Sequence, residues 1–178
     1  MNIIMFSGYI GSGKSAAARI LNQRIPDSKV ISFAERIKDG TAEFYNIQRS
    51  LCDTQEGKAT FLPNHNKTVR ELILDYSAYM KATHGPLIWI DMTITLIKNN
   101  PTITTWLIDD WRYINELTTL KAAFPTAKIT TVRITRQAVI PLDFESEHAL
   151  DDYLMDIPIE NNGSIVELTD ALITLITH

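Results

Sequence analysis

Residues 6–20 read FSGYIGSGKSAAARI, and this stretch places three glycines between Gly8 and Gly13. It follows an apolar run, residues 3–6, without alternation of polar and apolar side chains, which is typical of a central parallel strand covered on both faces. Residues 14–24 carry apolar side chains at helical spacing, and Pro26 ends the segment. The stretch therefore predicts a strand, a tight glycine-rich turn and a helix in direct succession.

The turn matches the pattern G-x-x-x-x-G-K-[ST] in full. Glycines let the backbone bring its N–H groups up to phosphate oxygens, and the N-terminus of the following helix favours an anion. Lys14 can bridge β- and γ-phosphate oxygens in a catalytic role, and the Ser15 hydroxyl can bind Mg²⁺. The alternative is a turn that binds nothing, but the strand before it and the helix after it favour a nucleotide site. The residues expected to bind the nucleotide are Gly8, Gly11, Ser12, Gly13, Lys14 and Ser15.

Strands and helices alternate along the whole chain. Apolar strands are predicted at residues 3–6, 29–33, 104–108, 128–135 and 157–159, and helices at residues 14–24, 35–45, 68–83, 86–98, 114–124 and 145–154. Pro158 favours a sheet edge for the fifth strand, and Ser164 with Glu167 predicts a capping box for a final helix. The pattern predicts an α/β fold, the three-layer P-loop NTPase fold with a five-stranded, mainly parallel sheet. We expect a single domain over residues 1–178, with a loop or insertion at residues 46–66.

The composition limits the class of partner. With 45% hydrophobic residues, 21% charged residues and a net charge of −4, the chain lacks the basic face that nucleic-acid binding usually requires. No segment reaches the roughly 18 uncharged apolar residues of a membrane span, and no signal peptide is recognisable. The single cysteine, Cys52, excludes an internal disulfide. We expect a cytoplasmic protein whose partners are small-molecule nucleotides, with no nucleic acid and no membrane.

Two carboxylates, Asp109 and Asp110, end the strand at residues 104–108, where open α/β sheets carry their ligand chemistry. A carboxylate there can hold a water on Mg²⁺, and we predict Asp110 with Ser15 as the metal-binding residues; the alternative is a turn initiator or a helix cap. The sequence lacks the N-K-x-D and D-x-x-G motifs of a GTPase. A GTPase is therefore not expected, and a small-molecule kinase fits the chain length.

Five cations are of interest because a kinase must bring two polyanions together without repulsion. All except Arg70 lie near the C-terminal end of a predicted strand, which is the sheet edge that carries the phosphate loop. Singly, each is also compatible with a solvated surface charge, but together they favour a phosphate-transfer site. They are Lys38, Arg70, Arg112, Arg133 and Arg136.

Further segments resemble those of a known family. They are SFAERIK at residues 32–38, VREL at 69–72, LIW at 87–89, DWRYINE at 110–116, VRITR at 132–136, SEHALDDY at 146–153 and IENNGS at 159–164. Together with the phosphate loop, and in the same order, these segments resemble those of the deoxynucleoside monophosphate kinases of bacteriophages and related viruses. DWRYINE and SEHALDDY are the most specific of them.

The resemblance implies the nucleoside monophosphate kinase fold and transfer of the γ-phosphoryl of ATP to a deoxynucleoside monophosphate, with Mg²⁺. It implies a lid over residues 137–148 that begins after a catalytic arginine, Arg136, and a nucleotide-binding role for Arg133. Phe33 and Trp89 are candidates for stacking on the acceptor base, with core packing as the alternative. The residues expected to bind the acceptor are Phe33, Lys38, Arg70, Trp89, Asp110 and Arg112, of which Arg112 is also expected to be catalytic.

Two other functions remain open from the sequence. One is phosphorylation of another small phosphorylated molecule, because the phosphate loop also resembles that of dephospho-coenzyme A kinase, and the S-F-A and D-x-R segments resemble animal-type phosphomevalonate kinase. The other is a non-catalytic nucleotide-binding regulator, although a pure binder need not keep Lys14, Ser15 and the arginines. Residues 46–66 either cover the acceptor site or pack against a second subunit of a homodimer.

Overall fold

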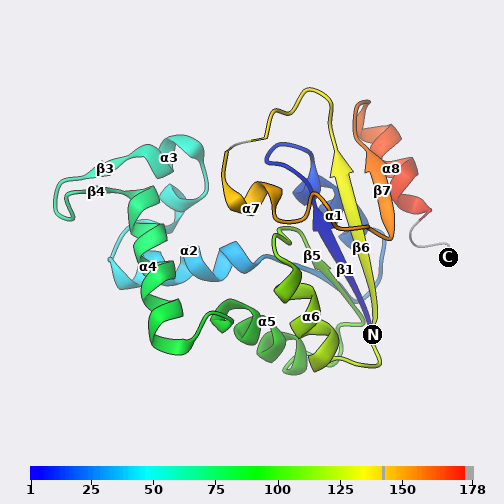
Figure 1. Ribbon diagram of the computed structural model, residues 1–178, viewed down its shortest axis with the longest axis horizontal. Helices are drawn as coiled ribbons and strands as arrows, with labels where there is room; N and C mark the ends of the chain where they lie inside the picture. Colours follow the sequence, from blue (N-terminus) through cyan, green and yellow to red (C-terminus); the bar gives the residue numbers. More distant parts are fainter. Residues whose placement is uncertain (142, 175–178) are drawn as a thin grey trace. The chain divides into compact units, whose positions relative to one another are not determined.

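The computed structural model describes residues 1–141 and 143–174 of the chain. The strands of its main sheet are separated by helices, as the sequence predicts, but between β2 and β5 several helices and a small two-stranded sheet follow one another (Figure 1). The strands are β1 (Asn2–Ser7), β2 (Ser28–Ile31), β3 (Phe61–Leu62), β4 (Lys67–Thr68), β5 (Thr105–Ile108), β6 (Lys128–Thr135) and β7 (Ile157–Glu160). The helices are α1 (Lys14–Asn22), α2 (Phe33–Phe44), the 3-10 helix η1 (Arg49–Cys52), α3 (Gln55–Ala59), α4 (Val69–His84), α5 (Ile88–Lys98), α6 (Ile114–Ala123), α7 (Glu145–His148) and α8 (Ile165–Ile173).

The main sheet has five strands in the order β2-β5-β1-β6-β7, and each neighbouring pair is parallel. The apolar strand β1 lies at the centre, with Ile3 opposite Trp106 of β5 and Phe6 opposite Val132 of β6. Strand β7, which contains Pro158, pairs with β6 alone and forms an edge, because proline has no N–H to give to a further strand. The predicted five-stranded parallel sheet and its proline-containing edge are confirmed.

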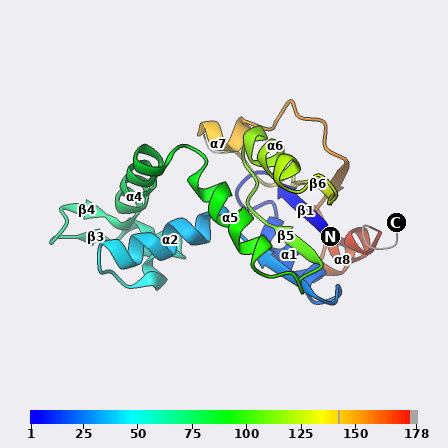
Figure 2. The same cartoon turned by 90° about the horizontal axis from the view of Figure 1, so that it is seen from below.

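The strand order determines which face each helix covers. From β1 the chain moves through α1 to the β2 side of the sheet, and from β5 it moves through α6 to the β6 side. Right-handed crossovers in opposite directions place their helices on opposite faces of the sheet. Figure 2 shows α1 and α8 on one side of β1 and α6 on the other. The result is a three-layer α/β arrangement.

The core of this arrangement is formed by the central strands and by the helices packed on one face. Phe6 of β1, Leu107 of β5 and Val132 of β6 are fully buried, and they share one cluster with Leu21 of α1 and Leu172 of α8. Burying such side chains contributes about 1.5–3 kcal/mol each. Helix α8 begins at a capping box between Ser164 and Glu167, as predicted.

The chain divides into two compact units. Residues Met1–Ser32 with Ile94–His178 form one, here called the sheet unit, and Phe33–Thr93 form the other, here called the helical unit. The sheet unit contains all five strands of the main sheet. The single-domain organisation expected from the sequence stays a prediction.

The helical unit gives structure to residues 46–66, for which the sequence shows no periodicity. These residues contain η1, the short helix α3 and the strand β3, which pairs in antiparallel fashion with β4. Helix α2 packs against α4, where a Cβ atom at Gly40 would lie 2.3 Å from the Tyr76 hydroxyl. Helix α4 begins at a capping box between Thr68 and Glu71. The insertion is therefore a small folded layer built on two helices.

Within the described part of the chain, no helix is both long enough and apolar enough to cross a membrane.

Candidate nucleotide-binding site

The candidate site lies at the C-terminal edge of the main sheet. Because all five strands are parallel, the residues that follow them emerge at the same edge. Gly8 follows β1, Ser32 follows β2, Asp109 follows β5, Arg136 follows β6 and Asn161 follows β7. The sheet therefore gathers the phosphate loop and four segments that the sequence analysis singled out.

The phosphate loop has a backbone that only glycine adopts without strain at its two ends. Gly8 has a φ of 139°, and a Cβ atom there would lie 2.2 Å from the backbone oxygen of Ile134. Gly13 has a φ of 110°, and a Cβ atom there would lie 2.4 Å from Nδ2 of Asn161. The loop therefore approaches β6 and the end of β7 more closely than any side chain would permit.

Replacing Gly8 with alanine is expected to destabilise the unliganded protein by more than the roughly 1–3 kcal/mol of a strained backbone position, because the methyl group also meets fixed backbone. Gly11→Ala is the matched control: its φ is 83°, but the nearest atom to a Cβ there is 3.7 Å away. Urea unfolding of both variants measures the difference. Equal losses in the two variants would contradict the close approach at Gly8.

Lys14 is buried within the loop, with 8% of its surface exposed. Its Nζ donates hydrogen bonds to the Gly8 oxygen at 2.7 Å and to the Tyr9 oxygen at 2.8 Å. Burial, followed by the positive charge of Arg112, lowers the pKa of Lys14 to about 8. The ammonium group is thus held across the loop, where a phosphate oxygen can replace a carbonyl oxygen as its partner.

The two carboxylates after β5 differ in their surroundings. The Asp110 side chain accepts a hydrogen bond from the Ser32 hydroxyl at 2.7 Å, which joins the DWRYINE and SFAERIK segments. Oδ1 of Asp109 is buried and has no hydrogen-bond partner within residues 1–141 and 143–174. A buried carboxylate oxygen without a partner is costly unless a cation or a donor binds it. Asp109 is thus a second candidate for the magnesium-binding role that the sequence predicts for Asp110, and the metal-binding role of either residue stays a prediction.

A hydroxyl and a carboxylate together suit Mg²⁺, which prefers oxygen ligands and keeps several of its waters. Ser15 lies at the start of α1 and is partly buried. No group of three or more histidine, cysteine or acidic side chains able to hold a metal occurs among the described residues. A hydroxyl with one carboxylate is the kind of donor set that leaves further Mg²⁺ positions to phosphate oxygens and water, as in P-loop proteins.

Arg112 is fixed at both ends. Its backbone N–H donates to Oε2 of Glu116 at 2.9 Å, and its guanidinium forms an ion pair with Glu147 of α7. Burial raises the pKa of Glu116 to about 7. Oε2 of Glu147 accepts a second hydrogen bond, at 2.7 Å, from the backbone N–H of Ile10 in the phosphate loop. Arg112 is thereby connected to the loop through one buried carboxylate.

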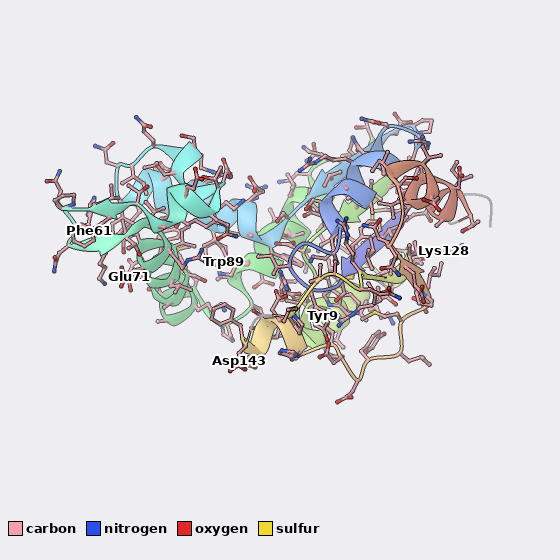
Figure 3. All side chains as sticks on the ribbon, turned by 90° about the horizontal axis from the view of Figure 1, so that it is seen from above. Tyr9, Phe61, Glu71, Trp89, Lys128 and Asp143 are labelled. Atoms are coloured by element: carbon pink, nitrogen blue, oxygen red, sulfur yellow. The ribbon has the colours of Figure 1, made fainter. Side chains whose placement is uncertain are left out.

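Arg133 and Tyr9 form a second contact between the loop and the segment after α7. The Arg133 guanidinium lies over the Tyr9 ring, 4.9 Å from its centroid, and pairs with Asp151 at 2.5 Å. The Tyr9 hydroxyl donates to the same carboxylate at 3.0 Å, and Figure 3 shows Tyr9 beside this segment. Burial acts to raise the pKa of Asp151, but hydrogen bonds from His148, Tyr9 and Arg133 outweigh it and lower that pKa. In this arrangement Arg133 supports the loop, and its nucleotide-binding role stays a prediction.

The loop before α8 also contacts the phosphate loop. Nδ2 of Asn161, which is buried, donates to the Ser12 oxygen at 2.8 Å, and Oδ1 of Asn162 accepts from the Gln137 N–H at 2.8 Å. The Ser12 hydroxyl is buried and has no hydrogen-bond partner in the described part of the chain. Arg136 is exposed one residue after β6 and makes no ion pair with any residue that the structure describes. Its guanidinium is therefore available to an anion.

The helical unit contains the other four residues predicted to bind the acceptor. Lys38 lies on α2 and pairs with Glu35 at 2.6 Å and Asp53 at 3.3 Å. Arg49 pairs with the same two carboxylates and with Asp39. Three carboxylates thus surround two cations, so the charge of Lys38 is neutralised within its own unit.

Arg70, Trp89 and Phe33 have different surroundings. Arg70, on α4, is exposed and donates to Oε1 of Gln55 at 2.6 Å, but it forms no ion pair within the described chain. Trp89, on α5, is buried and packs with its ring centroid 6.0 Å from that of Tyr76, and its indole N–H has no acceptor. Phe33 is buried at the start of α2. Within the described residues, Arg70 thus has no anionic partner, and the indole N–H of Trp89 has no acceptor.

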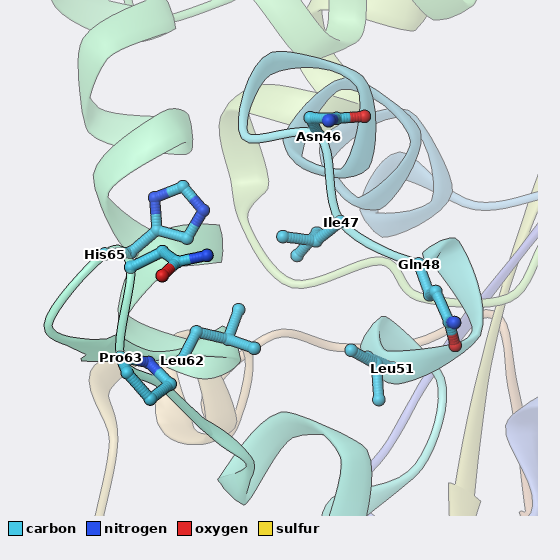
Figure 4. Close-up of a pocket in the computed structure, with 8 residues that line it drawn as sticks. Asn46, Ile47, Gln48, Leu51, Leu62, Pro63 and His65 are labelled. Carbon is cyan, nitrogen blue, oxygen red and sulfur yellow. The ribbon is translucent and has the colours of Figure 1, made fainter.

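The helical unit also contains a cavity of about 370 Å³. Residues of the segment 46–51 line one side of it and residues 62–65 the other (Figure 4). Ile47, Leu51 and Leu62 supply apolar surface, and the imidazole of His65 lies at its rim. The side chains of this cavity belong to the stretch that the sequence left unassigned.

Sequence reasoning missed several residues that build the site. Glu147, Asp151 and Asn161 bind the phosphate loop, and none of them was assigned a role. Each lies in a segment that was recognised as a motif, SEHALDDY or IENNGS. The motifs were the available signal, but the partners of these side chains are about 140 residues away in the sequence.

No protein-family model matches the sequence, and the sequence comparison with curated proteins finds no match. Among solved structures, the chain is similar to the tunicamycin resistance protein of Deinococcus radiodurans, at 16% identity over 98% of this chain and 95% of that one, with a TM-score of 0.51. Similarity extends to the APS kinase of Mycobacterium tuberculosis in complex with AMPPNP and APS, at 13% identity, 99% and 98% coverage and a TM-score of 0.48. It extends also to the shikimate kinase of Aquifex aeolicus, at 15% identity, 98% and 96% coverage and a TM-score of 0.45. Together with the parallel sheet and the phosphate loop, the first of these likenesses shows that the chain has the P-loop NTPase fold.

Proposed function

We propose that the chain is a deoxynucleoside monophosphate kinase, which transfers the γ-phosphoryl of ATP to a deoxynucleoside monophosphate and releases two diphosphates. The proposal combines the P-loop fold with the segments that resemble viral deoxynucleoside monophosphate kinases. Other P-loop proteins share the fold, so the fold does not identify the acceptor. The identity of the acceptor is inferred from the segments that resemble the viral kinases and from the helical unit.

One observation carries the phosphoryl-transfer part of the proposal. The sheet unit contains two buried groups that are costly to bury. One is the ammonium group of Lys14, and the other is Oδ1 of Asp109, which has no hydrogen-bond partner among the described residues. A protein that only needed a stable fold would gain nothing from either group, since both are costly to bury. Phosphoryl transfer uses both, because it depends on charge neutralisation and positioning rather than on covalent chemistry.

The remaining residues have distinct roles under this proposal. Ser15 and Asp109 would hold Mg²⁺, which when bound neutralises charge on the β- and γ-phosphates. Lys14 binds the same phosphates from the loop, and Arg112 and Arg136 stabilise the charge on the transferring group. Backbone N–H groups of the loop and of the first turn of α1 bind the phosphates of ATP.

The helical unit supports an acceptor that carries both a phosphate and a polar heterocycle. The Arg70 guanidinium is exposed and pairs with no carboxylate of the described residues, which suits a phosphate-binding residue. The Trp89 indole N–H is buried without an acceptor, and a base oxygen or nitrogen would satisfy it. Lys38 would have to exchange a carboxylate for the acceptor phosphate, because it is paired with Glu35 and Asp53.

The experiment that tests the proposal supplies the purified protein with ATP and Mg²⁺ and with one acceptor at a time. Each deoxynucleoside monophosphate, its ribonucleotide counterpart, dephospho-coenzyme A and phosphomevalonate are compared through the rate of ADP formation. We expect at least one deoxynucleoside monophosphate to raise that rate far above the rate with ATP alone. Stimulation by one of the last two compounds only would identify a different kinase, and no stimulation at all would favour the non-catalytic regulator.

The pKa of Lys14 predicts how activity depends on pH. Burial and Arg112 lower this pKa to about 8, while Glu147, Asp109 and Asp110 act to raise it. Only the protonated ammonium attracts phosphate, and kcat/KM reports the ionisation of the unliganded enzyme. We therefore expect kcat/KM for ATP to fall as the pH rises through about 8. A profile that stays flat well into the range in which an ordinary lysine titrates would contradict this account of Lys14.

A further inference from the structure

The carboxylate of Glu147 connects two parts of the site that are far apart in the sequence. Its side chain is 5% exposed, whereas the neighbouring Glu145 and His148 of the same short helix are exposed. Oε1 accepts from Nη1 of Arg112, and Oε2 accepts from the backbone N–H of Ile10. Both oxygens are thus occupied by donors, one from the DWRYINE segment and one from the phosphate loop.

Burial makes this connection rigid. The Glu147 carboxylate is buried whereas the Arg112 side chain is 25% exposed, so separating the pair would leave an unpaired buried charge on Glu147. The Arg112 backbone is fixed as well, since its N–H donates to Glu116 at 2.9 Å. Glu147 therefore determines where the guanidinium of Arg112 lies relative to the loop backbone.

The segment that carries Glu147 binds the loop at a second place. Asp151 accepts a hydrogen bond from the Tyr9 hydroxyl and pairs with Arg133, and the His148 ring lies 5.7 Å from the Tyr9 ring. Two consecutive loop residues, Tyr9 and Ile10, therefore form hydrogen bonds with residues 147–151. The proposed roles of ATP, Mg²⁺ and the arginines leave this arrangement of the SEHALDDY segment unexplained.

We propose that Glu147 is a positioning residue, which holds the Arg112 guanidinium and the Ile10 amide of the phosphate loop in a fixed relation so that Arg112 meets the transferring phosphoryl group without reorganisation. The inference rests on the proposed kinase function. Pre-organised charges of this kind cost nothing to arrange during the reaction, which is why they contribute to kcat rather than to substrate binding. Each oxygen of Glu147 already accepts from a protein donor, and a carboxylate repels the anionic phosphates, so Glu147 acts through Arg112.

The variant Glu147→Gln isolates this role, because glutamine has the same shape but only one accepting oxygen. The amide oxygen of glutamine can accept a hydrogen bond from either Ile10 or Arg112, and its NH₂ group then faces the other of these two donors. We expect kcat to fall about 10–100-fold, the usual cost of losing the partner that orients a functional group, while KM for ATP changes little. Glu145→Gln, on the exposed face of α7, is the matched control and should retain the activity of the original protein.

A double-mutant cycle separates positioning from a merely structural role. If Glu147 acts through Arg112, Glu147→Gln should have almost no further effect on kcat in an Arg112→Ala background. Losses that multiply in the double variant, or a Glu147→Gln kcat equal to that of the original protein, would overturn the proposal. Glu147→Asp keeps the charge and both acceptor oxygens, so it should recover part of kcat, and it serves as the probe if the glutamine variant does not fold.

A spectroscopic measurement keeps this test independent of the kinase assay. In the original protein the Ile10 amide donates to a carboxylate, so its proton resonance should lie downfield and should move upfield in Glu147→Gln. The Arg112 side-chain resonances should sharpen in the same variant as the guanidinium gains freedom. If neither signal changes, the fixed relation is absent; if both change but no acceptor is ever phosphorylated, the kinase proposal fails and the connection between Arg112 and the loop stands.

Discussion

Replacing Lys14 with alanine is expected to lower kcat/KM for ATP by at least ~10²–10³-fold while the chain stays folded. A fixed charge or donor aimed at developing negative charge is worth about this much in other enzymes. Lys14 is buried and donates to two carbonyl oxygens of its own loop, so the substitution removes a desolvated charge along with its hydrogen bonds. Removing a buried charge is favourable, and this offsets part of the cost of losing the two hydrogen bonds. The free energy of unfolding should therefore change little.

Two further variants make the Lys14 prediction specific. Lys14→Met keeps most of the side-chain volume and should be as inactive as the alanine variant, which excludes a packing defect as the cause. Arg19→Ala removes an exposed cation from the same helix and should retain full activity. Steady-state kinetics, with urea unfolding as the check on folding, measures all three. Substantial turnover by Lys14→Met would rule out a phosphate-binding role for the ammonium group.

Replacing Asp109 with asparagine is expected to raise the Mg²⁺ concentration needed for half-maximal activity and to lower kcat by about 10²-fold, as expected when a charged group at the reacting phosphates is lost. The reason is Oδ1, which is buried without a hydrogen-bond partner among the residues that the structure describes. Asparagine is uncharged at the same size, so the variant should unfold at an equal or higher urea concentration. Activity and stability should therefore move in opposite directions.

Asp110→Asn is the matched comparison, since the adjacent carboxylate already accepts a hydrogen bond from Ser32. We expect it to leave the Mg²⁺ requirement nearly unchanged. Titrations of activity with Mg²⁺ for the two variants show which of the two carboxylates binds the metal. A raised requirement in Asp110→Asn, with a normal one in Asp109→Asn, would return the metal-binding role to Asp110, the residue that the sequence alone suggested.

The elements with strong local signals could be predicted from the sequence. The apolar run of β1, the glycines after it and the capping box at Ser164 are all determined by residues that are close in the chain. Pro158 specified an edge because its missing N–H excludes a second neighbour. These signals were sufficient for the sheet, for its parallel direction and for the position of the phosphate loop.

Other features depend on contacts that no local pattern records. The segment at residues 46–66 contains a 3-10 turn, the five-residue helix α3 and the two-residue strand β3, which are too short to show periodicity. Helix α7 ends at His148 rather than continuing to residue 154, because residues 147–151 turn towards the phosphate loop. Glu147 could not be told from a surface glutamate, since its two partners lie in distant segments.

The proposed phosphoryl transfer can be measured by following the γ-phosphate itself. ATP radiolabelled at its γ-phosphate is incubated with the protein, Mg²⁺ and the deoxynucleoside monophosphate that most stimulates ADP formation, and the products are separated. We predict that the label appears in the deoxynucleoside diphosphate in amounts equal to the ADP formed, and that no label is transferred by Lys14→Met. Label that appears only as inorganic phosphate, or that remains in ATP with every acceptor, would contradict the assignment of this chain as a deoxynucleoside monophosphate kinase.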